Sequence, residues 1–309
     1  MKSLSALLTL AVLAGTSAVA QMSPPMVSEI TTKISDHVWT IMDVPNAVVV
    51  GSHSMLVVDI GLGSKNGATA ARLAAKLAPN NPKLFLTTTH FHPEHAAAEP
   101  GFPPGTILIR NAVQQQEMET HGQEMIDKCS QRSPQNKDLL AGVVLRSPEV
   151  IFNQEATIDL GGVTARLLWF GGAHTKGGEL TLVEPDRTLI SGDVVQNKTM
   201  PNIFGDGRTP PSWLAVLDKV AALNAVHVLP DHSAPGDGSL VVAELNLISE
   251  IRTRALALKR QGISPDDAGN KSAPTSKRSI PTGPTPTPSD SSKALCGSSI
   301  GQGDAAKSV

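Results

Sequence analysis

This chain of 309 residues has few cysteines, a small net charge and few long apolar stretches. The only two cysteines, Cys129 and Cys296, do not fit the metal-ligand pattern described below, so no thiolate metal site is expected. The formal net charge is only −2 and no basic stripe follows the sequence, which argues against a nucleic-acid partner. No apolar run is long enough to cross a bilayer, so we expect no integral membrane span.

The first twenty residues have the three parts of a secretory signal peptide. Lys2 supplies the basic start, residues 7–14 form an apolar run, and Ala18-Val19-Ala20 precedes Gln21 as a small-residue cleavage site. The apolar run is too short for a membrane span, and the other interpretation is a first core helix. We therefore predict a signal peptide over residues 1–20 and an exported mature protein, in a bacterial periplasm.

Composition also separates the C-terminal end from the rest. From Ile263 onward, prolines are scattered among Ser, Thr, Gly and Lys, with no aromatic residue. Such a stretch cannot bury enough surface to offset its ordering entropy, so residues 263–309 are predicted to be a disordered tail, either a linker or an unselected extension. Residues 21–29 form a lead-in, and residues 30–262 are predicted to be one globular domain.

Within that domain, β-branched apolar segments alternate with helical patterns, which predicts an α/β fold. A run of strands followed by alternating helices and strands occurs twice along the domain. This repeated pattern suits two sheets packed together with helices outside. Predicted strands are residues 38–41, 47–50, 55–60, 83–88, 106–110, 149–152, 156–160, 163–170, 179–183, 188–191 and 226–229. Predicted helices are residues 64–77, 111–128, a helix opened by Pro211, and 240–260.

The most informative segment is T-T-T-H-F-H-P-E-H, which follows one of these strands. It places His90, His92, Glu94 and His95 within six residues. Imidazole is the commonest protein ligand for zinc and related metals, and carboxylate oxygen is the next available. In an extended segment His90 and His92 point the same way, which leaves Glu94 and His95 for a neighbouring ion. The segment therefore predicts a metal-dependent hydrolase.

Three later residues each stand directly after a short apolar run. His174 lies in G-G-A-H-T, Asp193 in L-I-S-G-D-V-V and His232 in H-V-L-P-D-H. Ligands on loops at strand ends, held by a rigid sheet, are typical of metal and catalytic sites. A turn role is the other interpretation for Asp193. The remaining histidines are interpreted as structural or exposed: His37, His53, His121 and His227.

In this order the residues resemble the H-x-H-x-D-H pattern of the metallo-β-lactamase-fold superfamily, with its later His, bridging Asp and final His. Asp59 in V-V-D-I-G is similar to the early strand-end aspartate of that family, which supports the ligands by hydrogen bonding. The resemblance spans about residues 30–262 and implies an αβ/βα sandwich of two mixed β-sheets packed face to face. One departure is Glu94, which stands where the family has Asp and is one methylene longer.

The resemblance also implies a role for each ligand. His90, His92 and His174 would hold one divalent metal, Glu94, His95 and His232 a second, and Asp193 would bridge them. A metal-bound hydroxide would then attack an ester, lactone, thioester or lactam carbonyl of a small-molecule substrate.

Zinc is the expected metal, with iron or manganese as alternatives. Glu94 and Asp193 are the expected catalytic groups, with Glu94 as a ligand or a proton carrier, and the loops 42–46 and 201–206, including Phe204, would select the substrate. The alternatives are a β-lactamase proper and an exported metal-binding protein with little or no turnover. The sequence does not indicate an oligomeric state.

Overall fold

The computed structural model describes residues 26–42, 46–80, 83–203, 208–265 and 267–268. The predicted signal peptide, Phe204 and most of the predicted tail lie outside these residues. Within the described part of the chain, no helix is long and apolar enough to span a bilayer.

A seven-stranded sheet forms the N-terminal half, with its strands in chain order from β1 to β7. Its first four strands pair antiparallel and its last four pair parallel, so the sheet is mixed. The strands are β1 (Thr31–Lys33), β2 (Val38–Ile41), β3 (Ala47–Val50), β4 (Ser54–Val58), β5 (Lys83–Thr87), β6 (Ile107–Asn111) and β7 (Val150–Phe152).

A six-stranded sheet forms the C-terminal half, in the order β13-β12-β11-β10-β9-β8. Only β11 and β12 pair parallel in this sheet, and α5 connects them. The strands are β8 (Glu155–Asp159), β9 (Thr164–Leu168), β10 (Leu180–Glu184), β11 (Thr188–Gly192), β12 (His227–Pro230) and β13 (Gly236–Asp237).

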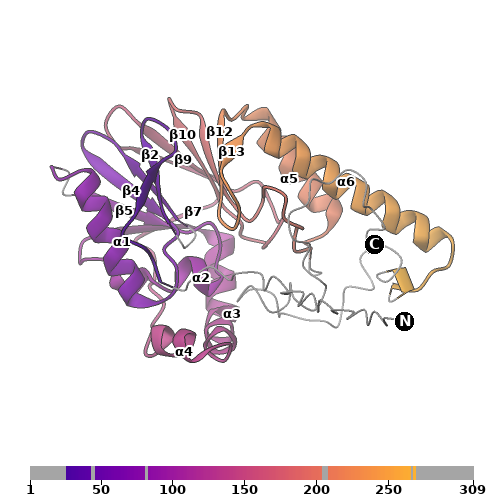
Figure 1. The fold of residues 1–309 in the computed structure, drawn as a ribbon, viewed down its shortest axis with the longest axis horizontal. Coiled ribbons are helices and arrows are strands. Elements are labelled where there is room, and N and C mark those ends of the chain that lie inside the picture. Colours follow the sequence, from indigo (N-terminus) through magenta and orange to yellow (C-terminus); the bar gives the residue numbers. More distant parts are fainter. Residues whose placement is uncertain (1–25, 43–45, 81–82, 204–207, 266, 269–309) are drawn as a thin grey trace, which may run out of the picture.

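The two sheets pack face to face, and helices cover their outer faces (Figure 1). Between the sheets, Leu56 and Val58 of β4 pack with Leu167 of β9 and Ile190 of β11. The helices are α1 (Gly63–Leu77), α2 (Pro93–Ala96), the 3-10 turn η1 (Glu99–Gly101), α3 (Ala112–Ser130), α4 (Pro134–Leu140), α5 (Pro210–Ala222) and α6 (Ser239–Arg260). This arrangement confirms the predicted αβ/βα sandwich.

Burial explains why these segments fold as they do. Alternate residues of β3 and β4 face either the sheet interface or α1, so both strands are apolar along almost their whole length. On the other side, the fully buried Trp213 of α5 packs with Val241 and Ile248 of α6 against the second sheet. Fully burying one such side chain contributes roughly 1.5–3 kcal/mol.

Candidate metal centre

The seven sequence-predicted ligands come from loops at the ends of four strands and from α2. His90 and His92 follow β5, and His92 is the N-cap of the short helix that carries Glu94 and His95. His174 lies between β9 and β10, Asp193 follows β11, and His232 follows β12. The donor atoms of these residues form groups of three. Within each group, the three donor atoms lie within 4.8 Å of one another.

The first group consists of three buried imidazoles, those of His90, His92 and His174. His92 Nδ1 lies 3.0 Å from His90 Nε2 and 3.4 Å from His174 Nε2. Around a tetrahedral zinc with bonds of about 2.0–2.1 Å, ligand nitrogens are about 3.3–3.4 Å apart. The spacing of these nitrogens therefore fits one metal ion.

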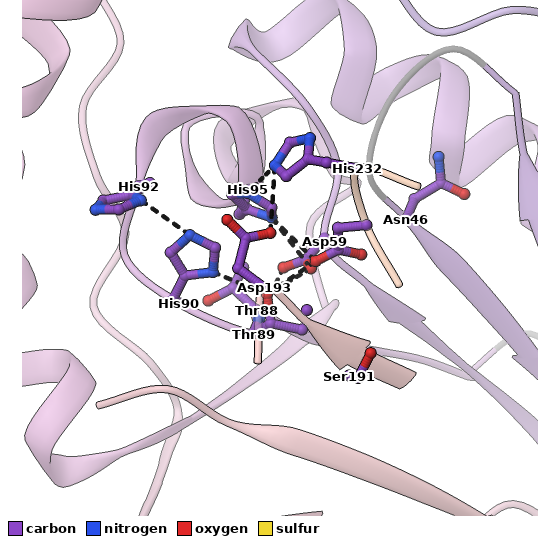
Figure 2. Close-up of polar contacts among 12 residues, drawn as sticks. Asn46, Asp59, Thr88, Thr89, His90, His92, His95, Ser191, Asp193 and His232 are labelled. Atoms are coloured by element: carbon purple, nitrogen blue, oxygen red, sulfur yellow. Dashed lines mark hydrogen bonds and ion pairs between the residues drawn. The ribbon is translucent and has the colours of Figure 1, made fainter. Parts of the chain in front are cut away.

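Asp193 lies between this group and a second one (Figure 2). Its Oδ2 is 3.2 Å from His174 Nε2, while its Oδ1 is 3.4 Å from His232 Nε2. One carboxylate thus presents one oxygen to each group, which is the geometry that a bridging ligand requires.

The second group combines His95, His232 and Glu94. The Nε2 atoms of the two histidines are 3.2 Å apart, again a separation that suits two ligands of one ion. Glu94 is half-buried, and its Oε2 is a buried atom without a hydrogen-bond partner among the described residues. A carboxylate oxygen of Glu94 lies within 4.8 Å of a ring nitrogen of His95 and of His232, so the longer side chain reaches the group.

Hydrogen bonds also surround the first group. The Thr89 hydroxyl lies 2.7 Å from Asp59 Oδ2 and 3.1 Å from His90 Nδ1, so it connects the buried Asp59 carboxyl group to the first histidine. His90 Nε2, on the other side of the ring, faces His92. Asp59 also accepts from the Thr89 N–H at 2.7 Å, so this buried carboxylate sets the start of the histidine segment.

Burial keeps the first group neutral and hence able to ligate a metal. Burial first, and the neighbouring imidazoles second, hold the pKa of His90 and of His92 well below the usual range. Burial likewise lowers the pKa of His174 to about 4, although the Asp193 carboxylate opposes the shift. All three side chains therefore offer unprotonated nitrogens at neutral pH.

His95 differs because two carboxylates face it. Burial alone would lower its pKa, but Asp59 and Asp231, whose Oδ2 atoms lie 3.3 and 3.4 Å from His95 Nδ1, raise it well above the usual value. Burial, and then the charge of Asp231, raise the pKa of Asp59 to about 8. A cation bound at His95 must therefore displace a proton, so metal binding at the second group is favoured by higher pH.

Three polar residues near the ligands were not recognised from the sequence. Asp231 and Thr89 are hydrogen-bonding partners of the ligand set, and Gln196 Nε2 donates to Asp193 Oδ1 at 3.1 Å. Asp231 directly precedes His232, and Thr89 directly precedes His90, so adjacency to a ligand was the one available signal. Asp59 was predicted to support the ligands, and its contacts agree with that role.

A small cleft opens beside the second group. Asp193 and His232 form its polar wall, and Met200 and Pro201, from the segment after β11, form an apolar wall. Met200 is 45% exposed, which is high for a large apolar side chain. Part of one predicted selectivity loop, Pro201 and Asn202, thus lies near the centre, whereas residues 204–206 and 43–45 are outside the described chain.

The four histidines predicted to be structural or exposed stay apart from the centre. His37 Nδ1 pairs with Asp186 Oδ1 at 2.6 Å, and His121 lies on α3 near Glu124. His53 is exposed, and His227 is half-buried in β12. Within the described part of the chain, none of them belongs to a group of metal-ligand atoms.

No protein-family model matches the chain. One curated relative, the linear primary-alkylsulfatase of Pseudomonas sp. (strain ATCC 19151), is 24% identical over 228 residues, which cover 62% of this chain and 43% of the relative. The chain thus spans less than half the length of the curated protein that it matches.

Solved structures are similar in fold. A metallo-beta-lactamase from Pontibacter korlensis matches with a TM-score of 0.57 and 18% identity, covering 71% of this chain and 98% of that one. The stereoselective inverting sec-alkylsulfatase Pisa1 from Pseudomonas sp. matches with a TM-score of 0.64 and 13% identity, covering 79% of this chain and 45% of that one. With its two mixed sheets, outer helices and histidine cluster, this chain has the metallo-β-lactamase fold.

Proposed function

We propose that this protein is a hydrolase that works with two divalent metal ions, of which zinc is the best match to the ligand set. The observation that carries the proposal is Asp193, whose two oxygens face His174 on one side and His232 on the other. A ligand set of several imidazole nitrogens with carboxylate oxygens suits zinc, manganese and iron. The distances between the ring nitrogens of His90, His92 and His174 suit tetrahedral zinc. When bound, such ions supply a deprotonated water as nucleophile and polarise the bond to be cleaved.

The residues of the chain prepare this chemistry in three ways. His90, His92 and His174 are kept neutral by burial, so they are ready to ligate at neutral pH. Asp59 and Thr89 hold the histidine segment in place by hydrogen bonds. The remaining side of the centre opens into the cleft, where a substrate can approach.

Glu94 is assigned two roles, as a ligand at the second group and as the carrier of a proton to the leaving group. Its buried Oε2 has no hydrogen-bond partner in the described chain, so this oxygen is available to a cation or a water. The positive charge of Arg132 acts on the same carboxylate. An acid needs to be within reach of the leaving atom, and the short helix α2 places Glu94 beside His95 at the centre.

For the substrate we propose an ester-type small molecule with an apolar group. The apolar group would lie against Met200 and Pro201, and the bond to be cleaved would lie next to Asp193 and His232. A carboxylic ester, thioester, lactone or lactam is the first candidate, since attack on a carbonyl is the reaction predicted from the ligand pattern. A sulfate ester is the second candidate, supported by the alkylsulfatase relatives.

Metal analysis paired with a substrate panel tests the proposal. The mature protein is expected to hold two ions per chain and to cleave at least one of an aryl acetate, a thioester, an acyl lactone, a β-lactam or an alkyl sulfate. Activity should be lost on chelation, restored by zinc, and absent in His92→Ala, whereas His53→Ala, at an exposed histidine, should match wild type. Two bound ions with no turnover across the panel would favour the metal-binding alternative, and no bound ion would refute both.

We also propose that the protein is exported, on the strength of the pattern Lys2, residues 7–14 and Ala18-Val19-Ala20. Expression of the full chain in a Gram-negative host, with fractionation and N-terminal sequencing, tests this. A mature N-terminus at Gln21 in the periplasmic fraction is expected. An intact N-terminus in the cytoplasmic fraction would contradict export.

A further inference from the structure

Gln196 stands out among the polar residues around the centre because it contacts the elements of two predicted ligands at once. Its Nε2 donates to Asp193 Oδ1 at 3.1 Å, and its Oε1 accepts from the Ser233 hydroxyl at 2.7 Å. Ser233 directly follows His232. Both ends of one buried amide are therefore used to join the loop after β11 to the loop after β12.

Further hydrogen bonds make this connection rigid. The Ser233 hydroxyl accepts from the Asn197 N–H at 2.8 Å, and Gln196 Nε2 also lies 3.3 Å from the Gly192 carbonyl oxygen. Because an amide bonded at both its oxygen and its nitrogen has one orientation, Gln196 cannot flip without losing a partner. The amide thus specifies which way the Asp193 carboxylate is turned.

The backbone of Gln196 is held in turn by Glu244 of α6. Glu244 is 2% exposed, and its carboxyl group lies within reach of the Gln196 backbone N–H as an acceptor. Its Oε1 has no hydrogen-bond partner among the described residues. A buried carboxyl group is costly unless it is hydrogen-bonded, and the partner that Glu244 finds is the residue whose side chain contacts Asp193.

We propose that Gln196, supported by Glu244, is a positioning residue that turns Asp193 Oδ1 toward the second metal ion. This inference rests on the proposed two-metal function and adds to it. Asp193 Oδ1 is the oxygen that faces His232, whereas the first ion keeps three imidazoles whatever the orientation of Asp193. Loss of the amide should therefore weaken the second ion selectively.

Stepwise zinc titration of the metal-free protein, by competition with a chromophoric chelator, measures the two affinities separately. In Gln196→Met the second ion should bind about 10- to 100-fold more weakly, the usual range for loss of a ligand's hydrogen-bonding partner. The first ion should bind within a few-fold of wild type. The matched control Gln116→Met, at an exposed position on α3, should leave both affinities unchanged.

A second pair of variants separates positioning from general loss of structure. Glu244→Gln keeps an acceptor for the Gln196 N–H and should retain the wild-type affinity, whereas Glu244→Leu removes it and should weaken the second ion. Equal weakening of both ions, or wild-type binding of both ions in Gln196→Met, would overturn the positioning role while leaving the two-metal proposal intact. A wild-type protein that binds no zinc would overturn both.

Discussion

Replacing Glu179 by glutamine should remove a loss of stability that the wild-type chain suffers as the pH rises from mildly acidic values to about 8. Glu179 is buried where β10 begins, next to the ends of β5 and β6. Thr87 Oγ1 lies 2.6 Å from Glu179 Oε1 and 2.9 Å from the Ile109 carbonyl oxygen. A hydroxyl has one hydrogen, so Thr87 must share it between the two oxygens when Glu179 is ionised, whereas a protonated Glu179 can donate to Thr87 and leave that hydrogen for Ile109.

The pKa of Glu179 agrees with this geometry. Burial raises it from 4.5 to about 8, although the hydrogen bonds that Thr87 and Asn111 can donate to the ionised form oppose the shift. In the unfolded chain the carboxyl ionises near pH 4.5, so the folded state binds more protons between pH 4.5 and 8. Its stabilising effect is therefore complete below the unfolded pKa and is lost as pH rises through the folded value. At about 1.4 kcal/mol per pH unit, and with half of the folded molecules ionised at pH 8, the loss is about 2 kcal/mol between pH 6 and pH 8 and reaches about 3 kcal/mol by pH 9.

Urea unfolding of the metal-free protein in a chelator measures this, since bound metal would add its own pH dependence. Other groups also titrate in this range, so the informative quantity is the difference in the free energy of unfolding between wild type and Glu179→Gln. Between pH 6 and pH 9, this difference should change by about 3 kcal/mol in favour of the variant. The glutamine amide can donate to Thr87 as the protonated carboxyl does. Parallel stability profiles for the two proteins would refute the assignment of a protonated Glu179.

Three further changes test the supports of the centre. Gly192→Ala should lower the free energy of unfolding by about 1–3 kcal/mol, because Gly192 has a φ of 54° and a Cβ there would lie 2.7 Å from Thr89 Cβ. Thermal unfolding measures this, and an unchanged melting temperature would contradict it. Trp213→Phe should cost about 1–3 kcal/mol in urea unfolding, because the buried Val194 carbonyl loses the Trp213 Nε1 donor at 3.0 Å; an unchanged midpoint would show that this bond contributes nothing. Thr89→Val keeps the shape of the side chain but removes the hydroxyl between Asp59 and His90, so it should weaken zinc binding about 10- to 100-fold. Wild-type zinc affinity in this variant would show that the hydroxyl does not support His90.

The cluster of candidate ligands could be predicted from the sequence because its signal is local and chemically rare. His90, His92 and His95 within six residues have few structural explanations, and His174 and His232 follow apolar runs that form strands. The buried strands were predicted for the same reason, since their composition reflects packing on both faces. The predicted helix 64–77 differs from α1 by one residue at its start.

Other parts depend on contacts between distant segments and have no such signal. Gln196 and Glu244 are ordinary polar residues in the sequence, and only the fold brings them together behind Asp193. The helix α4 was missed because its residues are mostly polar. Its start does carry a signal, since Ser133 accepts from the Asn136 N–H and Pro134 follows it. The short strand β1 is too polar and too brief to be recognised by alternation.

Anomalous scattering at the zinc edge, from crystals of the zinc-loaded protein, tests the two-metal assignment most directly. Two peaks are expected, one among His90, His92 and His174 and the other beside His95 and His232, with Asp193 between them. A single peak, or peaks that Asp193 does not separate, would contradict the account.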